Sequence, residues 1–139
     1  MTQVRELMST HIVHCTPVDN VYEAAVKMKE ESVGVIPVIE NKQVVGLVTD
    51  RDLVVRGIAE KHPGSNQITN VMTTNIVSVS PDDSIEKATE LMAQYQIRRL
   101  PVVESGQLVG MLALGDLAIR KSADDQAGFA LSEISEHME

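Results

Sequence analysis

The fold of this chain is decided by the stretch Gly46-Leu47-Val48-Thr49-Asp50-Arg51-Asp52-Leu53. An apolar run typical of a strand ends at Thr49, and a polar turn then opens an amphipathic segment at Leu53. The first N–H groups of a helix have no partner inside the helix, so a strand that feeds a helix in this way is suited to hold an anion. We therefore expect a strand-to-helix turn with binding capacity here.

A near copy of this stretch follows later, as Gly110-Met111-Leu112-Ala113-Leu114-Gly115-Asp116-Leu117. The same offset aligns residues 4–53 with residues 68–117 without a gap, and roughly 16 of the 50 aligned positions are identical. This duplication predicts two copies of one supersecondary unit, arranged about a pseudo-two-fold axis. Because each half is small, we expect the two halves to share one core.

Each copy has the pattern of a β-α-β-β-α unit, which predicts an α/β (α+β) fold. In the first copy we expect a helical lead-in, a short strand, a helix, two hairpin strands and a second helix that ends near Gly57, at residues 4–8, 12–15, 21–28, 35–39, 44–48 and 50–57. The expected domains are residues 4–60 and 68–121, with a linker at 61–67. The tail, residues 122–139, has room for one short helix over Phe129, Leu131 and Ile134.

Composition excludes several classes of protein. The net charge of −8 and the aromatic content of 2% argue against a nucleic-acid surface, which needs cations and stacking platforms. The single cysteine, Cys15, cannot form an internal disulfide and is expected to be a small buried residue. No apolar run approaches the ~20 residues that cross a bilayer, and no signal peptide is visible, so we expect a cytoplasmic protein.

The sequence offers no catalytic machinery. Phosphate-loop, nucleophile-elbow and dinucleotide-fingerprint motifs are missing, and the four histidines do not stand at zinc-ligand spacing. We therefore expect neither an enzyme, nor a metal site, nor a required cofactor.

The turn at Thr49 and Asp52 admits two interpretations. Thr-x-x-Asp is close to a capping box, which closes a helix start without any ligand. A carboxylate also accepts the hydroxyls of a ribose, a Thr hydroxyl suits a phosphate, and Arg51 adds a fork-shaped donor. The second copy keeps Asp116 but has Ala113 in place of the hydroxyl, which suggests that capping is not the requirement common to both copies.

The order of these motifs resembles a tandem of cystathionine-β-synthase (CBS) domains, a Bateman module, of the stand-alone bacterial type. The matching features are the Met-(Ser/Thr)-Thr openings at Met8 and Met72, the two Pro strands and the two Gly-x-x-x-x-x-Asp-Leu ends, over about residues 4–120. The Pro strands are Ile36-Pro37-Val38 and Leu100-Pro101-Val102.

The resemblance implies a sensor that binds the adenosyl part of AMP, ADP, ATP, NAD or S-adenosylmethionine in clefts between the repeats. In the first site Asp52 would contact the ribose and Thr49 the phosphate, and the base pocket would consist of Thr10, His11, Ile12, Val33, Val35 and Pro37. In the second site Asp116 would contact the ribose, with Asn75, Ile76, Ile97, Arg98, Arg99 and Pro101 nearby.

The loss of a hydroxyl at Ala113 departs from the family pattern. A hydrogen bond to a charged group is worth roughly 1.5–3 kcal/mol, or about ten-fold or more in affinity, so the second site is expected to be the weaker one unless Arg98 or Arg99 compensates. The alternative function is an interaction module without a specific ligand. We further expect a homodimer and an unidentified protein target in trans.

Overall fold

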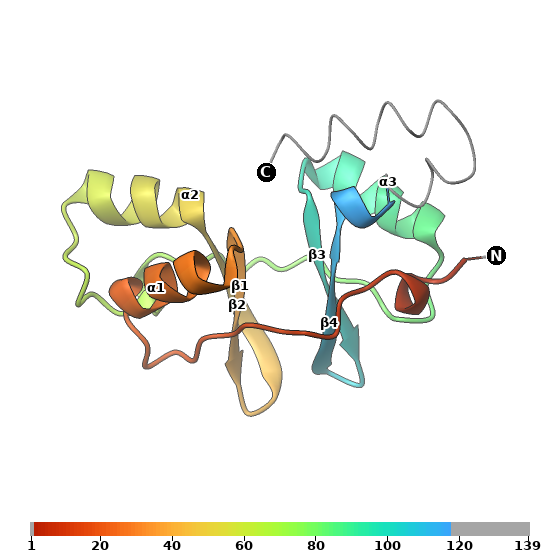
Figure 1. Cartoon of the computed structure of the whole chain (residues 1–139), viewed down its shortest axis with the longest axis horizontal. Helices are drawn as coiled ribbons and strands as arrows, with labels where there is room; N and C mark the ends of the chain where they lie inside the picture. Colours follow the sequence, from red (N-terminus) through yellow and green to blue (C-terminus); the bar gives the residue numbers. More distant parts are fainter. Residues whose placement is uncertain (1, 118–139) are drawn as a thin grey trace. The chain divides into compact units, whose positions relative to one another are not determined.

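The structure, a computed structural model, describes residues 2–117, in which the two halves repeat the same elements (Figure 1). The first half contains η1 (Val4–Glu6), α1 (Val21–Glu31), β1 (Val35–Glu40), β2 (Gln43–Thr49), α2 (Asp50–Asp52), η2 (Leu53–Gly57) and η3 (Ile58–Glu60). The second half contains η4 (Ile68–Asn70), α3 (Ile85–Tyr95), β3 (Arg99–Glu104) and β4 (Gln107–Ala113), followed by helix at 114–117. The short helix predicted in the tail lies outside the described residues.

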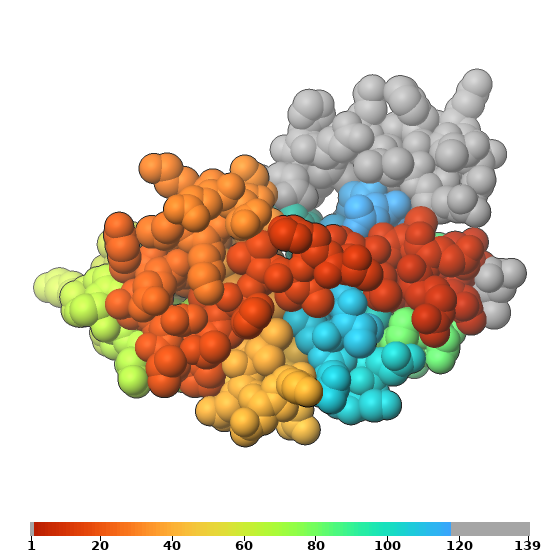
Figure 2. All heavy atoms as spheres, turned by 60° about the horizontal axis from the view of Figure 1, so that its bottom comes forward, coloured from red at the N-terminus to blue at the C-terminus, as the bar shows by residue number. Residues whose placement is uncertain are grey.

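The chain folds into two compact units, and their boundaries differ from those of the sequence repeat. Unit 1 combines Met1–Ile12 with Val77–Glu139, and unit 2 is Val13–Ile76. In unit 1 the N-terminal segment pairs with β4 through Ser9 and Met111, and Figure 2 shows this segment in red against the cyan strand. Each unit therefore combines the hairpin of one repeat with the lead-in of the other.

Each unit is built on an antiparallel hairpin. β1 pairs with β2, and β3 with β4, in the same register and with the same irregularity, after Val38 and after Val102. The predicted turn at 40–43 is confirmed: Asn41 and Lys42 have φ of 53° and 68°, as a two-residue type I′ turn requires. The second hairpin turns through Ser105 and Gly106 with φ of 53° and 79°.

The predicted first strand is reduced to a single bridge in each unit. The N–H of Cys15 donates a hydrogen bond to the carbonyl of Pro37 on β1, and the carbonyl of Cys15 accepts one from the N–H of Ile39. The next bond of a parallel ladder would run from the N–H of residue 37 to the carbonyl of Val13, and proline has no N–H. The expectation of a strand over residues 12–15 was therefore wrong. Val79 makes the same single bridge beside Pro101.

Each of the two long helices begins after a polar N-cap residue. Asn20 caps α1, and Ser84 caps α3 by accepting from the N–H of Lys87. The carboxylate of Asp83 instead accepts from the N–H of Ser80, in the turn before the helix. Short polar side chains in such turns satisfy backbone groups that no helix or strand pairs.

The helix after β2 also runs past its predicted end. Residues 53–57 form a π turn, η3 continues to Glu60, and Lys61 closes the helix in the left-handed region with φ of 61°. Gly57 has φ of −97°, so it is not the C-cap that the sequence suggested.

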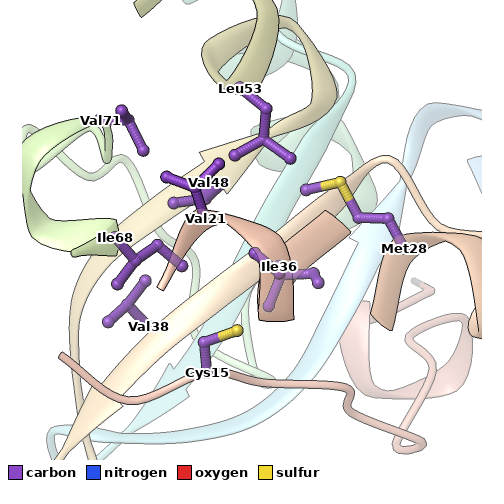
Figure 3. Close-up of a cluster of buried hydrophobic side chains, with 10 residues drawn as sticks. Cys15, Val21, Met28, Ile36, Val38, Val48, Leu53, Ile68 and Val71 are labelled. Carbon is purple, nitrogen blue, oxygen red and sulfur yellow. The ribbon is translucent and has the colours of Figure 1, made fainter. Parts of the chain in front are cut away.

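Buried side chains form one cluster in each unit rather than the single shared core that we expected. In unit 2 the cluster joins α1, the hairpin and the lead-in of the second repeat, which supplies Ile68 and Val71, both fully buried (Figure 3). In unit 1 the N-terminal lead-in supplies Val4. The exchanged lead-in thus completes the apolar cluster of each unit.

Candidate functional site

The turn between β2 and α2 is closed by a reciprocal capping box. The N–H of Thr49 donates to Oδ2 of Asp52, and the N–H of Asp52 donates to Oγ1 of Thr49, each over 3.0 Å. Both side chains are thereby held at the strand end, and the side chain of Asp52 is 15% exposed. The box leaves the hydroxyl proton of Thr49 and acceptor capacity on the carboxylate of Asp52 for another partner.

The second copy keeps half of this arrangement. The N–H of Ala113 donates to Oδ2 of Asp116 over 3.1 Å, as the N–H of Thr49 does to Asp52. The carboxylate therefore caps the turn in both units, and only the hydroxyl half of the box is missing in unit 1. Our inference from the sequence that capping is not common to the two copies was wrong.

Arg56 is a site neighbour that the sequence analysis missed. Its Nη1 lies 4.0 Å from Oδ1 of Asp52, one helical turn away. The same atom donates to the carbonyls of Val71 and Met72, both over 3.3 Å, and to Oγ1 of Thr73 over 3.4 Å. The i,i+4 spacing from Asp52 was the signal that pointed to this contact.

Asp50 places a second carboxylate at the same turn. Its N–H donates to the carbonyl of Gly34 over 2.9 Å, and its Oδ1 accepts from the N–H of Arg51 over 2.8 Å. A Cβ on Gly34 would lie 3.1 Å from Oδ2 of Asp50, so the glycine leaves room for this carboxylate.

Unit 1 has different side chains at the matching positions. The N–H of Leu114 donates to the carbonyl of Arg98 over 2.8 Å, in the place of Asp50 and Gly34. Arg99 pairs across the strands with Ala113, as Val35 pairs with Thr49 in unit 2. Residues that pair directly have Cβ atoms about 5 Å apart on one face, so the side chain of Arg99 starts beside that of Ala113. Its Nη1 donates to the carbonyl of Arg98 over 3.5 Å.

The two units divide the predicted site residues between them. Unit 2 contains eight of them: Thr49, Asp52, Arg51, Val33, Val35, Pro37, Asn75 and Ile76. Unit 1 contains the other eight: Thr10, His11, Ile12, Asp116, Ile97, Arg98, Arg99 and Pro101. The turns bring Thr49 together with Asp52, and Asp116 with Ala113, whereas Thr10–Ile12 belong to the unit opposite to that of Asp52.

Other reactive groups lie apart from these turns. Cys15 is fully buried, and burial raises the pKa of its thiol to about 11, so the prediction of a small buried residue is confirmed. Within residues 2–117 no group of three or more His, Cys, Asp or Glu side chains is placed to hold a metal ion. No helix among the described residues is long and apolar enough to span a bilayer.

Comparisons with known proteins agree with these observations. The CBS domain family matches residues 4–57 and 68–121. The uncharacterized protein YlbB of Bacillus subtilis (strain 168) is 50% identical over 138 residues, which cover 98% of this chain and 93% of YlbB. A putative signal-transduction protein with CBS domains from Burkholderia ambifaria superposes with a TM-score of 0.82 at 27% identity, covering 89% of this chain and 96% of that one.

The fold is also that of the CBS domain pair of protein MJ0100, solved in complex with 5′-methylthioadenosine and S-adenosyl-L-methionine. The TM-score is 0.81 at 20% identity, with 90% of this chain and 99% of the other covered.

Proposed function

This chain belongs to the CBS domain family, and we propose that it is a regulatory module that binds an adenosyl ligand without catalysis and signals to a partner protein. The ligand class comprises AMP, ADP, ATP, NAD and S-adenosylmethionine. The support from the fold is that the MJ0100 pair binds adenosyl compounds. The support from the residues is the pair of capped turns.

The observation that carries this proposal is the state of the Asp52 carboxylate. One oxygen is held by the N–H of Thr49, and the group is only 15% exposed, so its direction is set before a ligand arrives. A pre-oriented carboxylate with spare acceptor capacity suits a ribose diol, and the hydroxyl of Thr49 beside it suits a phosphate oxygen. In this proposal the side chains at Val33, Val35 and Pro37 contribute to the base pocket.

The alternative, an interaction module without a specific ligand, is supported by a different observation. Both Asp52 and Asp116 accept a backbone N–H, so each carboxylate has a structural task that needs no ligand. The two functions therefore have to be separated by removing the charge of the carboxylate while keeping the cap.

Asp52→Asn makes this separation, because the amide oxygen still accepts from the N–H of Thr49. Calorimetric titration of the full chain with AMP, ATP, NAD and S-adenosylmethionine is expected to show binding, and Asp52→Asn is expected to weaken the binding of S-adenosylmethionine about ten-fold or more. Asp19→Asn, the same change at a carboxylate of the same unit that accepts from the N–H of Thr16, is the matched control and retains binding to S-adenosylmethionine within a few-fold. An absence of heat and of thermal shift with every ligand at millimolar concentration would favour the interaction module.

We further propose that the protein forms a homodimer through an apolar surface of unit 2. Val18, Tyr22 and Ile58 are 81%, 65% and 70% exposed there, whereas the repeat places Asp82 and Glu86 at the positions of Val18 and Tyr22 in unit 1. A two-fold axis would bring the same apolar side chains of two copies together and remove them from water. Sedimentation is expected to show a dimer at micromolar concentration, and Tyr22→Glu is expected to give a monomer.

A further inference from the structure

The two capped turns differ in charge more than in shape. Four positions change between unit 2 and unit 1 in the immediate surroundings of the shared carboxylate: Gly34 to Arg98, Val35 to Arg99, Asp50 to Leu114 and Arg51 to Gly115. Three of these changes make unit 1 more positive by one charge each, and the fourth makes it less positive by one. The turn of unit 1 therefore carries two more positive charges than the turn of unit 2.

The structure puts these changes at the turn itself. Arg99 is the direct cross-strand partner of Ala113, whose N–H holds Oδ2 of Asp116 at 3.1 Å. The carbonyl of Arg98 accepts from the N–H of Leu114, the residue that follows Ala113. Both cationic residues are thus fixed, through their backbones, within one residue of the capped position.

In unit 2 the matching positions make the turn less positive. The carboxylate of Asp50 replaces Leu114, and Gly34 leaves room beside it, with Oδ2 only 3.1 Å from the position of a Cβ. Two carboxylates, Asp50 and Asp52, therefore flank this turn. The charges of Asp50, Arg51, Asp52 and Arg56 at this turn sum to zero, so an added phosphate meets no net attraction there.

We infer that the two turns select adenosyl ligands of different charge: unit 1 the polyphosphate form, and unit 2 a form with little or no negative charge. This inference rests on the proposed function, since it assigns a ligand class to each of its two carboxylates. In this inference Arg99 compensates for the hydroxyl that Ala113 lacks, because a guanidinium binds phosphate through charged and forked hydrogen bonds.

The test uses full-length variants in which one carboxylate at a time loses its charge. Asp52→Asn leaves the turn of unit 1 intact, and Asp116→Asn leaves that of unit 2, and both amides keep an acceptor for the backbone N–H. Each variant is titrated with adenosine and with ATP in the absence of divalent cations. Asp52→Asn is expected to bind ATP about ten-fold or more tightly than adenosine, and Asp116→Asn to bind ATP no more tightly than adenosine.

An exchange of side chains between the units makes the test specific. In the Asp52→Asn background, Arg99→Val is expected to weaken ATP binding about ten-fold and to leave adenosine binding within two-fold. Lys87→Ala, which removes one positive charge from the exposed surface of α3 in the same unit, is the control and leaves both affinities within two-fold. In the Asp116→Asn background, Val35→Arg is expected to create a preference for ATP.

Three results would overturn the inference: equal affinities for ATP and adenosine in Asp52→Asn, a preference for ATP in Asp116→Asn, or the same loss from Lys87→Ala as from Arg99→Val. If adenosine binds to both single variants but ATP is preferred by neither, the charge selection fails and the proposed function stands. If no adenosyl compound binds to the wild-type chain, both fail.

Discussion

Sδ of Met72 lies 2.5 Å from the position that a Cβ would take on Gly46, so the lead-in of the second repeat closes directly on the strand of the first. In the other unit Sδ of Met8 lies 2.7 Å from the same position on Gly110. The methionine that opens each repeat and the glycine near the end of each hairpin thus form a pair in space. A glycine is needed at both positions because the side chain of a methionine fills the space of its Cβ.

Gly110→Ala is expected to destabilise the protein more than Gly46→Ala. A Cβ on Gly110 would also meet the carbonyl oxygen of Ser9 at 3.0 Å, and this backbone atom is held by its pairing with Met111, whereas on Gly46 only the flexible side chain of Met72 has to move. Overpacking of this kind costs about 1–3 kcal/mol, which urea denaturation resolves. In double-mutant cycles, Gly46→Ala is expected to cost much less in a Met72→Ala background, whereas Gly110→Ala keeps much of its cost in a Met8→Ala background because the Ser9 carbonyl remains. Equal losses in the two single variants would contradict the role of the Ser9 carbonyl.

Lys42→Gly is expected to stabilise the first hairpin. Lys42 has φ of 68°, a left-handed conformation that costs a residue with a side chain about 1 kcal/mol, and the second hairpin has Gly106 at the matching position. The reverse change, Gly106→Lys, should lower the free energy of unfolding by a similar amount. Thermal unfolding of both variants measures the pair, and a loss of stability in Lys42→Gly would be inconsistent with a type I′ turn.

Thr49→Ala is expected to cost about 1 kcal/mol of stability, because it removes the oxygen that accepts from the N–H of Asp52. Ala113→Thr should gain a comparable amount, since the N–H of Ala113 already bonds to Asp116 and only the hydroxyl is missing. Both values are measured by chemical denaturation without ligand. If Ala113→Thr brings no gain, the two turns do not share the geometry described here.

Cys15 is expected to make stability fall at alkaline pH. Its thiol has a pKa of about 11 in the folded protein against an ordinary value of 9.0, so it is neutral in both states below pH 9 and ionises first in the unfolded chain above it. Unfolding therefore becomes more favourable between about pH 9 and pH 11, by about 2–3 kcal/mol in total. Cys15→Val, which copies Val79 of the other unit, should lose this part of the pH dependence. Parallel pH profiles for the two proteins would argue against a buried neutral thiol.

Residues 13–76 are expected to fold as a fragment, and residues 4–60 are not. The first fragment keeps the whole buried cluster of unit 2, including Ile68 and Val71 from the second repeat, whereas the second fragment loses both. Circular dichroism should show cooperative thermal unfolding for 13–76 alone. Cooperative unfolding of 4–60 with equal stability would show that the exchanged lead-in is dispensable.

Much of the fold was predictable because it depends on local patterns. The duplication, the two hairpins and the long helices follow from spacing and turn residues, and Thr49 and Asp52 were correctly placed at a strand-to-helix turn. The strand expected at residues 12–15 failed for a reason outside its own sequence, because the proline that ends its ladder lies on β1. The contacts of Arg56 with residues 71–73 were also out of reach, since these partners belong to the lead-in of the other repeat.

The sequence by itself determined that the chain contains two equivalent repeats with unequal turns, because repeats and substitutions can be read without coordinates. Only the tertiary structure decided that each hairpin receives the lead-in of the other repeat. The two lead-ins are near copies, as are the two hairpins, so propensity and apolar periodicity are the same for either pairing. Packing decides between them: Met72 fills the space beside Gly46, and Met8 fills the space beside Gly110.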